Sequence, residues 1–199
     1  MSGSSSRFAP LMAREIEDSI QVKQRVIDEH ISTLADVVEL LVQTLRAGKK
    51  VVLFGNGGSA ADSQHIAAEL VSRFRRERQA LPAMALTTDT SILTAIANDY
   101  SFENVFSRQI EAIGQPGDVA IGISTSGNSP NVLKGVRAAQ DRGMTTVGLT
   151  GASGGKLKEC VDICFRAPSQ STPRIQEVHI TVAHAICELV EQELCRSDA

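Results

Sequence analysis

The chain has 199 residues, of which 42% are hydrophobic and 22% are charged, a balance typical of a soluble globular protein with one full core. Its formal net charge of −3 gives no general electrostatic reason to bind nucleic acid or an anionic membrane, so any bound anion must be held by local donors. The sequence has no apolar run of the ~20 residues needed to cross a bilayer, and its start lacks the apolar core of a signal peptide. These features predict a cytoplasmic protein without a membrane or nucleic-acid partner.

The N-terminal part is expected to be helical after a short tail. Residues 1–12 are predicted to form a flexible tail, and Ala13 to Gly48 two amphipathic helices, because apolar side chains recur at helical spacing and Gly48 stands at an expected C-cap. One sheet does not need this much helix as cover, so the helices are expected to pack on other subunits.

From Lys50 onward, apolar runs alternate with helical patterns. Strands are predicted at 50–54, 83–86, 118–123, 145–149 and 161–165, and helices at about 60–76, 91–97, 103–113, 130–142 and 175–194, with a short helix near 156. Near-continuous apolar strands between helices indicate a parallel sheet covered on both faces. We therefore predict a single doubly wound α/β domain over residues 13–199, with its core at about 33–195, built on a five-stranded parallel sheet of flavodoxin-like type.

The stretch 54–70, FGNGGSAADSQHIAAEL, joins a strand end, a glycine turn and a helix start. Glycines let a ligand approach the bare backbone, and the N-terminus of the helix that follows favours negative charge. The turn has neither the lysine of a Walker-type phosphate loop nor the glycine spacing of a dinucleotide site. A glycine turn at this place is common, so a phosphate site needs support from elsewhere in the chain.

The loop after the third predicted strand gives that support. Residues 124–129, STSGNS, offer four hydroxyl groups at the start of another helix, and hydroxyl and N–H groups can hold phosphate oxygens without lysine. In a doubly wound sheet this loop and the glycine turn lie at the carboxyl ends of the strands, where ligands bind. An ordinary polar loop with an N-cap serine is the alternative. Asn98 and Asp99, after a short predicted helix, could meet sugar hydroxyls or simply form a turn.

Residues of metal-ligating type occur on two predicted helices. His65 and Glu69 are four residues apart, which places an imidazole and a carboxylate on one helix face about 6 Å apart along the axis. Such a pair can bind a divalent metal or share acid–base chemistry, but it is more often a surface contact. Taken alone, His184 would be a core histidine and Gln176 a surface residue. The four cysteines lack zinc-site spacing and are expected to be buried or incidental thiols.

Four motifs together resemble one known family. The segments GNGGSAADSQHIAAEL, LTTDTSILTAIANDY, ISTSGNSPNV and TPRIQEVHITVAH occur in the order and spacing of the bacterial phosphoheptose isomerases, which have the sugar isomerase (SIS) fold. The resemblance covers nearly the whole chain from about residue 15. It implies a cytoplasmic homotetramer, with active sites at subunit interfaces, that converts sedoheptulose 7-phosphate to D-glycero-D-manno-heptose 7-phosphate. That reaction is the first step toward the nucleotide-activated heptose of lipopolysaccharide core or another surface polysaccharide.

The resemblance also implies the residues of the site. It implies one Zn²⁺ per subunit, with nickel or iron as chemically suitable alternatives, on four ligands: His65, Glu69, Gln176 and His184. It implies that Glu69 and His184 are the catalytic pair. The implied substrate contacts are Asn56, Gly57, Gly58, Ser59, Glu69, Asn98, Asp99, Ser124, Thr125, Ser126, Ser129 and Gln176.

The spacing of two implied ligands leads to a further expectation. Gln176 and His184 are eight residues apart, so on one regular helix they are separated by ~12 Å and rotated by ~80°. One ion would be awkward for both side chains. We therefore expect that ligands from more than one chain share the site.

The implied chemistry is an aldose–ketose shift through an enediolate. Glu69 is expected to carry the proton between C1 and C2, and His184 to serve ring opening or the oxygen proton. Two other classes remain open: a non-catalytic protein of this fold that binds the replication initiator, and a phosphosugar-sensing regulatory domain. The presence of both Glu69 and His184 favours the enzyme.

Overall fold

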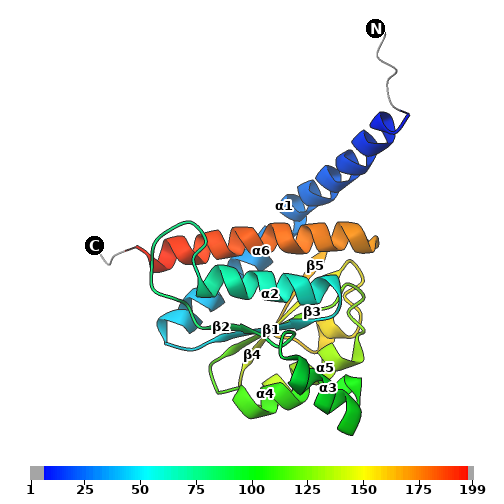
Figure 1. The fold of residues 1–199 in the computed structure, drawn as a ribbon. Coiled ribbons are helices and arrows are strands. Elements are labelled where there is room, and N and C mark those ends of the chain that lie inside the picture. The colour runs from blue at the N-terminus through cyan, green and yellow to red at the C-terminus, as the bar shows by residue number, and fades with distance from the viewer. Residues whose placement is uncertain (1–6, 197–199) are drawn as a thin grey trace.

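A five-stranded parallel sheet lies at the centre of the computed structural model, which describes residues 7–196 (Figure 1). Its strands follow the order β2-β1-β3-β4-β5, so the flavodoxin-like sheet predicted from the sequence is confirmed. The strands are β1 (Val51–Gly55), β2 (Ala83–Ala85), β3 (Val119–Ile123), β4 (Thr145–Gly151) and β5 (Ile163–Ala167).

Helices cover both faces of this sheet (Figure 1). One face carries α1 (Ala9–Arg46), α2 (Gly58–Val71) and α6 (Thr172–Leu194). The other carries α3 (Thr90–Asp99), α4 (Ser107–Ile113) and α5 (Pro130–Asp141), together with two 3₁₀ turns, Phe102–Asn104 and Leu157–Glu159. Within residues 7–196, no helix combines the length and the apolar composition that a bilayer crossing needs.

The two faces have separate apolar cores because successive strand residues point to opposite sides. In β1, Val51 and Leu53 pack with α1, α2 and α6, whereas Val52 and Phe54 pack with α4 and α5. All five residues of β1 are buried, as expected for a strand covered on both faces. The centre of the sheet is thereby held rigidly, and the loops at the ends of β1 and β3 are held with it.

The N-terminal part differs from the prediction. A single helix of 38 residues, α1, replaces the two helices expected over 13–48, because residues 11–46 contain neither proline nor glycine to break it. Residues 9–12, assigned to the tail, are helical, with Pro10 in the first turn, where proline is tolerated. Residues 7 and 8 of the expected tail form a turn, and residues 1–6 lie outside the described residues. The N-terminal half of α1 projects away from the sheet (Figure 1).

Three other boundaries differ. The second helix ends at Val71 rather than near 76, the helix predicted over 103–113 is split into a 3₁₀ turn and α4, and β5 begins at Ile163 rather than 161. The remaining elements lie within a few residues of their predicted ranges, as is usual for periodic segments.

Candidate active site

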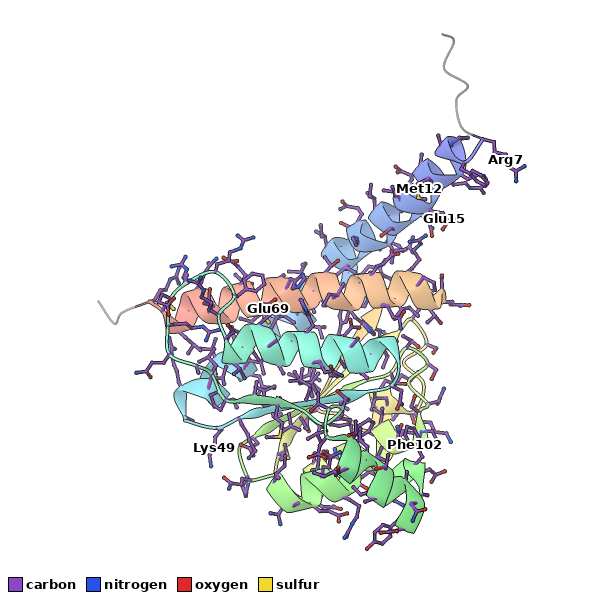
Figure 2. The ribbon with its side chains drawn as sticks, in the orientation of Figure 1. Arg7, Met12, Glu15, Lys49, Glu69 and Phe102 are labelled. Carbon is purple, nitrogen blue, oxygen red and sulfur yellow. The ribbon has the colours of Figure 1, made fainter. Side chains whose placement is uncertain are left out.

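Two imidazoles and a carboxylate meet between α2 and α6. His65 Nε2 lies 3.3 Å from Glu69 Oε1 and 2.8 Å from His184 Nε2. Ligand atoms of the three side chains all lie within 4.8 Å of one another. Figure 2 shows Glu69 where α2 faces α6. We call these three residues the His–Glu–His cluster.

Helix periodicity explains why these side chains meet. Ile66, Ala67 and Leu70 of α2 are buried, and they direct that side of the helix into the core. His65 and Glu69 lie on the neighbouring stripe, which faces α6 but leaves His65 exposed to solvent. His184 occupies the corresponding edge of the buried stripe of α6 and is half-buried.

The donor set fits a transition metal such as zinc. Two neutral imidazoles can share a hydrogen bond at 2.8 Å only if one Nε2 is protonated and the other accepts, and a metal ion would take the place of that proton. Two imidazoles and a carboxylate are ligands that zinc accepts, and three protein ligands leave a position open for substrate. The cluster therefore has the chemistry of a catalytic metal site.

Gln176, the fourth implied ligand, is not in this cluster. A Cβ placed on Gly58 would lie 2.4 Å from Gln176 Nε2, so this amide sits at the very start of α2. Gly58 precedes His65 by seven residues, or about 10 Å along the helix axis. Within one chain, Gln176 therefore points to the glycine turn rather than to the cluster. The expectation that subunits share the metal site stays a prediction.

The glycine turn is shaped by close backbone contacts. Gly57, the N-cap of α2, has a φ of 57°, in the region that glycine adopts most easily. The turn leads into the N-terminus of α2, whose first turn has no acidic residue to compete with an anion. Ser59 is buried there, and its backbone N–H donates to the carbonyl of Asn56 at 3.0 Å.

The amide of Asn56 is engaged within the protein. Asn56 and Asn131 exchange two side-chain hydrogen bonds of 2.9 and 2.8 Å, and Asn131 Oδ1 also accepts from the N–H of Val132. These bonds join the turn after β1 to the start of α5. Asn131 is buried, and the sequence analysis did not single it out, although it follows Pro130 at a helix start, where asparagine commonly makes local bonds.

The loop 124–129 is preformed beside this turn. Ser124 Oγ lies 2.9 Å from Ser129 Oγ, and the N–H of Gly127 donates to the carbonyl of Ser124 at 2.9 Å. Gly127 has a φ of 66°, and a Cβ there would lie 2.1 Å from the carbonyl oxygen of Gly154. Since β1 and β3 are paired neighbours, the turn and the loop lie together at the switch in strand order.

A polar pocket of about 430 Å³ adjoins the loop. Thr125 and Ser126 line one side of it, and residues from the ends of β4 and β5 and the start of α6 line the rest, including Ser153, Ser169 and Thr172. The hydroxyl groups of the loop therefore border a space large enough for part of a sugar phosphate.

Asn98 and Asp99 lie apart from these groups in the single chain. They end α3, on the sheet face opposite α2 and α6 (Figure 1), and both side chains are exposed. Asn98 Nδ2 donates to Asp99 Oδ1 at 2.8 Å. Their implied substrate role stays a prediction.

Two further side chains belong to the surroundings of the cluster. Asp62, one turn before His65, has a buried Oδ2 without a hydrogen-bond partner among the described residues. Burial raises the pKa of Asp62, and the charge of His65 opposes that rise. Burial, and then the charge of Glu69, raise the pKa of the Cys187 thiol to about 12. All four cysteines are free, as expected.

Comparison with known proteins agrees with this fold. Residues 16–151 match the family model described as "SIS domain". The phosphoheptose isomerase of Roseiflexus sp. (strain RS-1) is 60% identical over 194 residues, covering 98% of each chain. That of Aquifex aeolicus (strain VF5) is 56% identical over 178 residues, covering 89% of this chain and 93% of the relative.

Solved structures of phosphoheptose isomerases share this fold. The phosphoheptose isomerase GmhA from Neisseria gonorrhoeae superposes with a TM-score of 0.87 at 44% identity, covering 92% of this chain and 98% of the other. A phosphoheptose isomerase from Francisella tularensis gives a TM-score of 0.89 at 36% identity, covering 92% and 97%.

The parallel sheet of order 2-1-3-4-5, with two polar turns at its switch point, and the domain match define this chain as a member of the SIS domain family. Within that family it belongs to the phosphoheptose isomerases, at 51–60% identity to the relatives compared. The resemblance found in the sequence is thereby confirmed.

Proposed function

We propose that this chain isomerises sedoheptulose 7-phosphate to D-glycero-D-manno-heptose 7-phosphate, an aldose–ketose isomerisation. The observation that carries the proposal is the His–Glu–His cluster, assembled by α2 and α6 in a chain that shares 60% identity with a phosphoheptose isomerase. The substrate contacts proposed above follow from the same family. The heptose phosphate would serve the synthesis of nucleotide-activated heptose for a surface polysaccharide, in the cytoplasm.

The phosphate end of the substrate is assigned to the two loops at the switch point. Glycine N–H groups at the start of α2 and the hydroxyls of residues 124–129 provide donors without a fixed positive charge. Holding the phosphate there fixes which carbons of the sugar reach the cluster, which is the main gain from orienting a reactant.

The proposed metal ligands are His65, Glu69 and His184, with Gln176 as the fourth, and one Zn²⁺ is expected per subunit. When bound, zinc would supply Lewis-acid stabilisation of negative charge on the two reacting oxygens. Glu69 is proposed to take the proton from one carbon and return it to the other, and His184 to hold the proton that moves between the oxygens or opens the ring. Because Glu69 is proposed both as a ligand and as the base, it must leave the ligand role during proton transfer.

A homotetramer with shared sites is part of the proposal. The distance of Gln176 and Asn98 from the cluster within one chain supports contributions from a second subunit. Exposed apolar side chains support association through α1: Phe8, just before the helix, and Leu11, Met12, Ile16, Ile20, Ile27 and Ile31 along it.

Turnover of sedoheptulose 7-phosphate tests the function directly. Wild type should convert it, chelation of the metal should reduce the rate, and added Zn²⁺ should restore it. Glu69→Gln should lower kcat by about 10²–10⁴-fold, the usual range for loss of a general base. Glu111→Gln, on the exposed surface of α4, is the matched control and should retain the wild-type rate.

Two outcomes would contradict the proposal. A folded, zinc-loaded protein that binds the phosphosugar without converting it would instead support a non-catalytic binding protein. Unchanged turnover by Glu69→Gln would remove this residue from the proton path.

A further inference from the structure

A buried ion pair joins α6 to the loop that follows α2, near the C-terminal end of α2. Arg78 Nε lies 3.0 Å from Glu191 Oε2, and the two side chains are only 6% and 2% exposed. Replacing such a pair by apolar residues is often neutral or stabilising, so stability alone is a weak reason for its presence. The directions of its other hydrogen bonds suggest a different reason.

Glu191 binds the loop after α2 through three backbone groups. Its carboxylate accepts from the N–H of Phe74 at 2.8 Å and from the N–H groups of Arg75 and Arg76, both at 2.7 Å. The bound loop holds the Phe74 ring against the His184 ring, with centroids 5.8 Å apart. Glu191 therefore fixes one wall of the cluster.

Arg78 binds the last turn of α2. Its guanidinium donates to the carbonyl of Glu69 and to the carbonyl of Leu70, both at 2.9 Å. The last carbonyls of a helix have no partner within it, and a positive charge there also complements the helix dipole. The carbonyl of Leu70 also accepts from the N–H of Leu81 at 3.1 Å, whereas Arg78 is the side chain that holds the carbonyl of Glu69.

Each oxygen and each guanidinium nitrogen of the pair has a partner. Burial raises the pKa of Glu191, but hydrogen bonds from the N–H groups of Arg75, Phe74 and Arg76 and the charge of Arg78 outweigh it and hold the pKa below its ordinary value. Glu191 is therefore an ionised acceptor at neutral pH. A fully satisfied buried network of this kind imposes one geometry on the segments that it joins.

We propose that Arg78 and Glu191 are a positioning pair, which holds Glu69 through its backbone carbonyl and His184 through the Phe74 ring. Neither residue is assigned a contact with substrate or metal. The inference rests on the proposed function, because it concerns how that site is held in its working geometry. It adds two residues 113 positions apart that no motif of the sequence connects.

Arg78→Lys tests the pair while leaving its charge in place. Lysine can still neutralise Glu191, but it cannot reach both carbonyls as the guanidinium fork does. The expected result is a folded protein whose kcat falls about 10- to 100-fold, as for small misplacements of catalytic groups, while KM changes by less than about threefold. Zinc affinity, measured by chelator competition, should fall about tenfold, as when outer partners of metal ligands are lost. Arg46→Lys, which alters an exposed pair with Glu193, is the control and should change neither.

Glu191→Gln is the second variant, with Glu193→Gln on the same helix as its control. As in Arg78→Lys, kcat per folded molecule and zinc affinity should fall while KM changes little. The concentration of folded protein is measured independently, so that kcat refers to folded molecules only.

Three results would overturn the proposal. The first is wild-type kcat and zinc affinity in either soluble variant. The second is a lower melting temperature with unchanged kcat per folded molecule. The third is failure of both variants to fold, which would make the pair a folding element. If wild type itself lacks turnover, the proposed function fails, and zinc affinity still decides whether the pair positions the cluster.

Discussion

The buried carboxylates of this chain differ in how far they are satisfied. Asp118, 1% exposed at the start of β3, accepts from the N–H groups of Lys50 and Gln115 and from the ammonium of Lys50. Asp62, beside the cluster, has a buried oxygen without such a partner in the described part of the chain. Asp118 thus joins the chain segments that lead into β1 and β3, whereas Asp62 lies next to the proposed chemistry with part of its hydrogen-bonding capacity unused.

Asp118→Asn should therefore destabilise the protein, by about 3 kcal/mol, since it breaks a buried pair and leaves the Lys50 charge without its partner. Burial raises the pKa of Asp118, but the hydrogen bonds from Lys50 and Gln115 and the charge of Lys50 outweigh burial and hold the pKa below its ordinary value of 3.8. A depressed pKa in the folded state adds stability above pH 3.8 that is lost as the pH falls through the folded value. Urea unfolding at pH 7 and near pH 3 should show the gap between wild type and variant narrowing in acid, and an equal gap at both would contradict this.

At the residue scale, the sequence identified side chains by type and could not identify their distant partners. Helix spacing singles out His65 and Glu69, the motif resemblance adds His184, and the structure brings the three together. Arg78 and Glu191 were missed because they meet only through the packing of α2 on α6, 113 positions apart in the chain. No local pattern carries that information.

At the scale of elements, periodicity predicted the strands and a parallel sheet covered on both faces, while tertiary hydrogen bonds decided where α2 ends. The segment 72–78, SRFRRER, is rich in residues that favour helix, so propensity alone extends α2 through it. The N–H groups of Phe74, Arg75 and Arg76, which a continued helix would direct to its own carbonyls, bind Glu191 instead. A distant carboxylate therefore ends the helix.

The contact between the starts of α2 and α6 gives a prediction at the same scale. In Gly58→Ala, the added Cβ would lie 2.4 Å from Gln176 Nε2, and the flexible amide must turn away. If Gln176 binds substrate, KM should rise about tenfold, the equivalent of one lost hydrogen bond. Stability should change by less than about 1 kcal/mol, since alanine is the better helix former.

Steady-state kinetics in a double-mutant cycle check the effect on KM, because Gly58→Ala should have little further effect on KM in a Gln176→Ala background. Additive effects would show that Gly58 acts by another route.

At the scale of the whole molecule, α1 is the element whose apolar side chains a single chain leaves exposed. Its N-terminal half projects from the sheet (Figure 1) and exposes a row of apolar side chains at helical spacing. Farther along, α1 and α6 border an apolar groove of about 540 Å³ that includes Ile31, Val38 and Leu189. The sequence could show that α1 is amphipathic, but an amphipathic pattern does not say whether the buried side faces the same chain or another copy.

Replacing Ile16 and Ile20 together by lysine tests whether this row builds the proposed tetramer. Both side chains are more than half exposed in the single chain, at 55% and 54%, so their replacement should leave the subunit folded. Two buried charges would be intolerable in an apolar interface, so the assembly should dissociate, as measured by sedimentation velocity. Gln21→Lys with Asp28→Asn adds the same net charge on a neighbouring exposed face of α1, outside the apolar row, and should leave the assembly intact. An intact Ile16→Lys/Ile20→Lys assembly would place the interface elsewhere.

The activity of the dissociated protein then separates two arrangements of the site. If subunits share the site, as the position of Gln176 within one chain supports, dissociation should lower kcat/KM at least about 100-fold, since catalytic groups that act together lose most of their effect when one is removed. Zinc affinity should fall with it, because a ligand from a second chain would be lost. A dissociated subunit that keeps its turnover and its zinc would show that the His–Glu–His cluster of one chain is sufficient. Gln176 would then have to reach substrate from its place beside Gly58, and α1 would serve assembly alone.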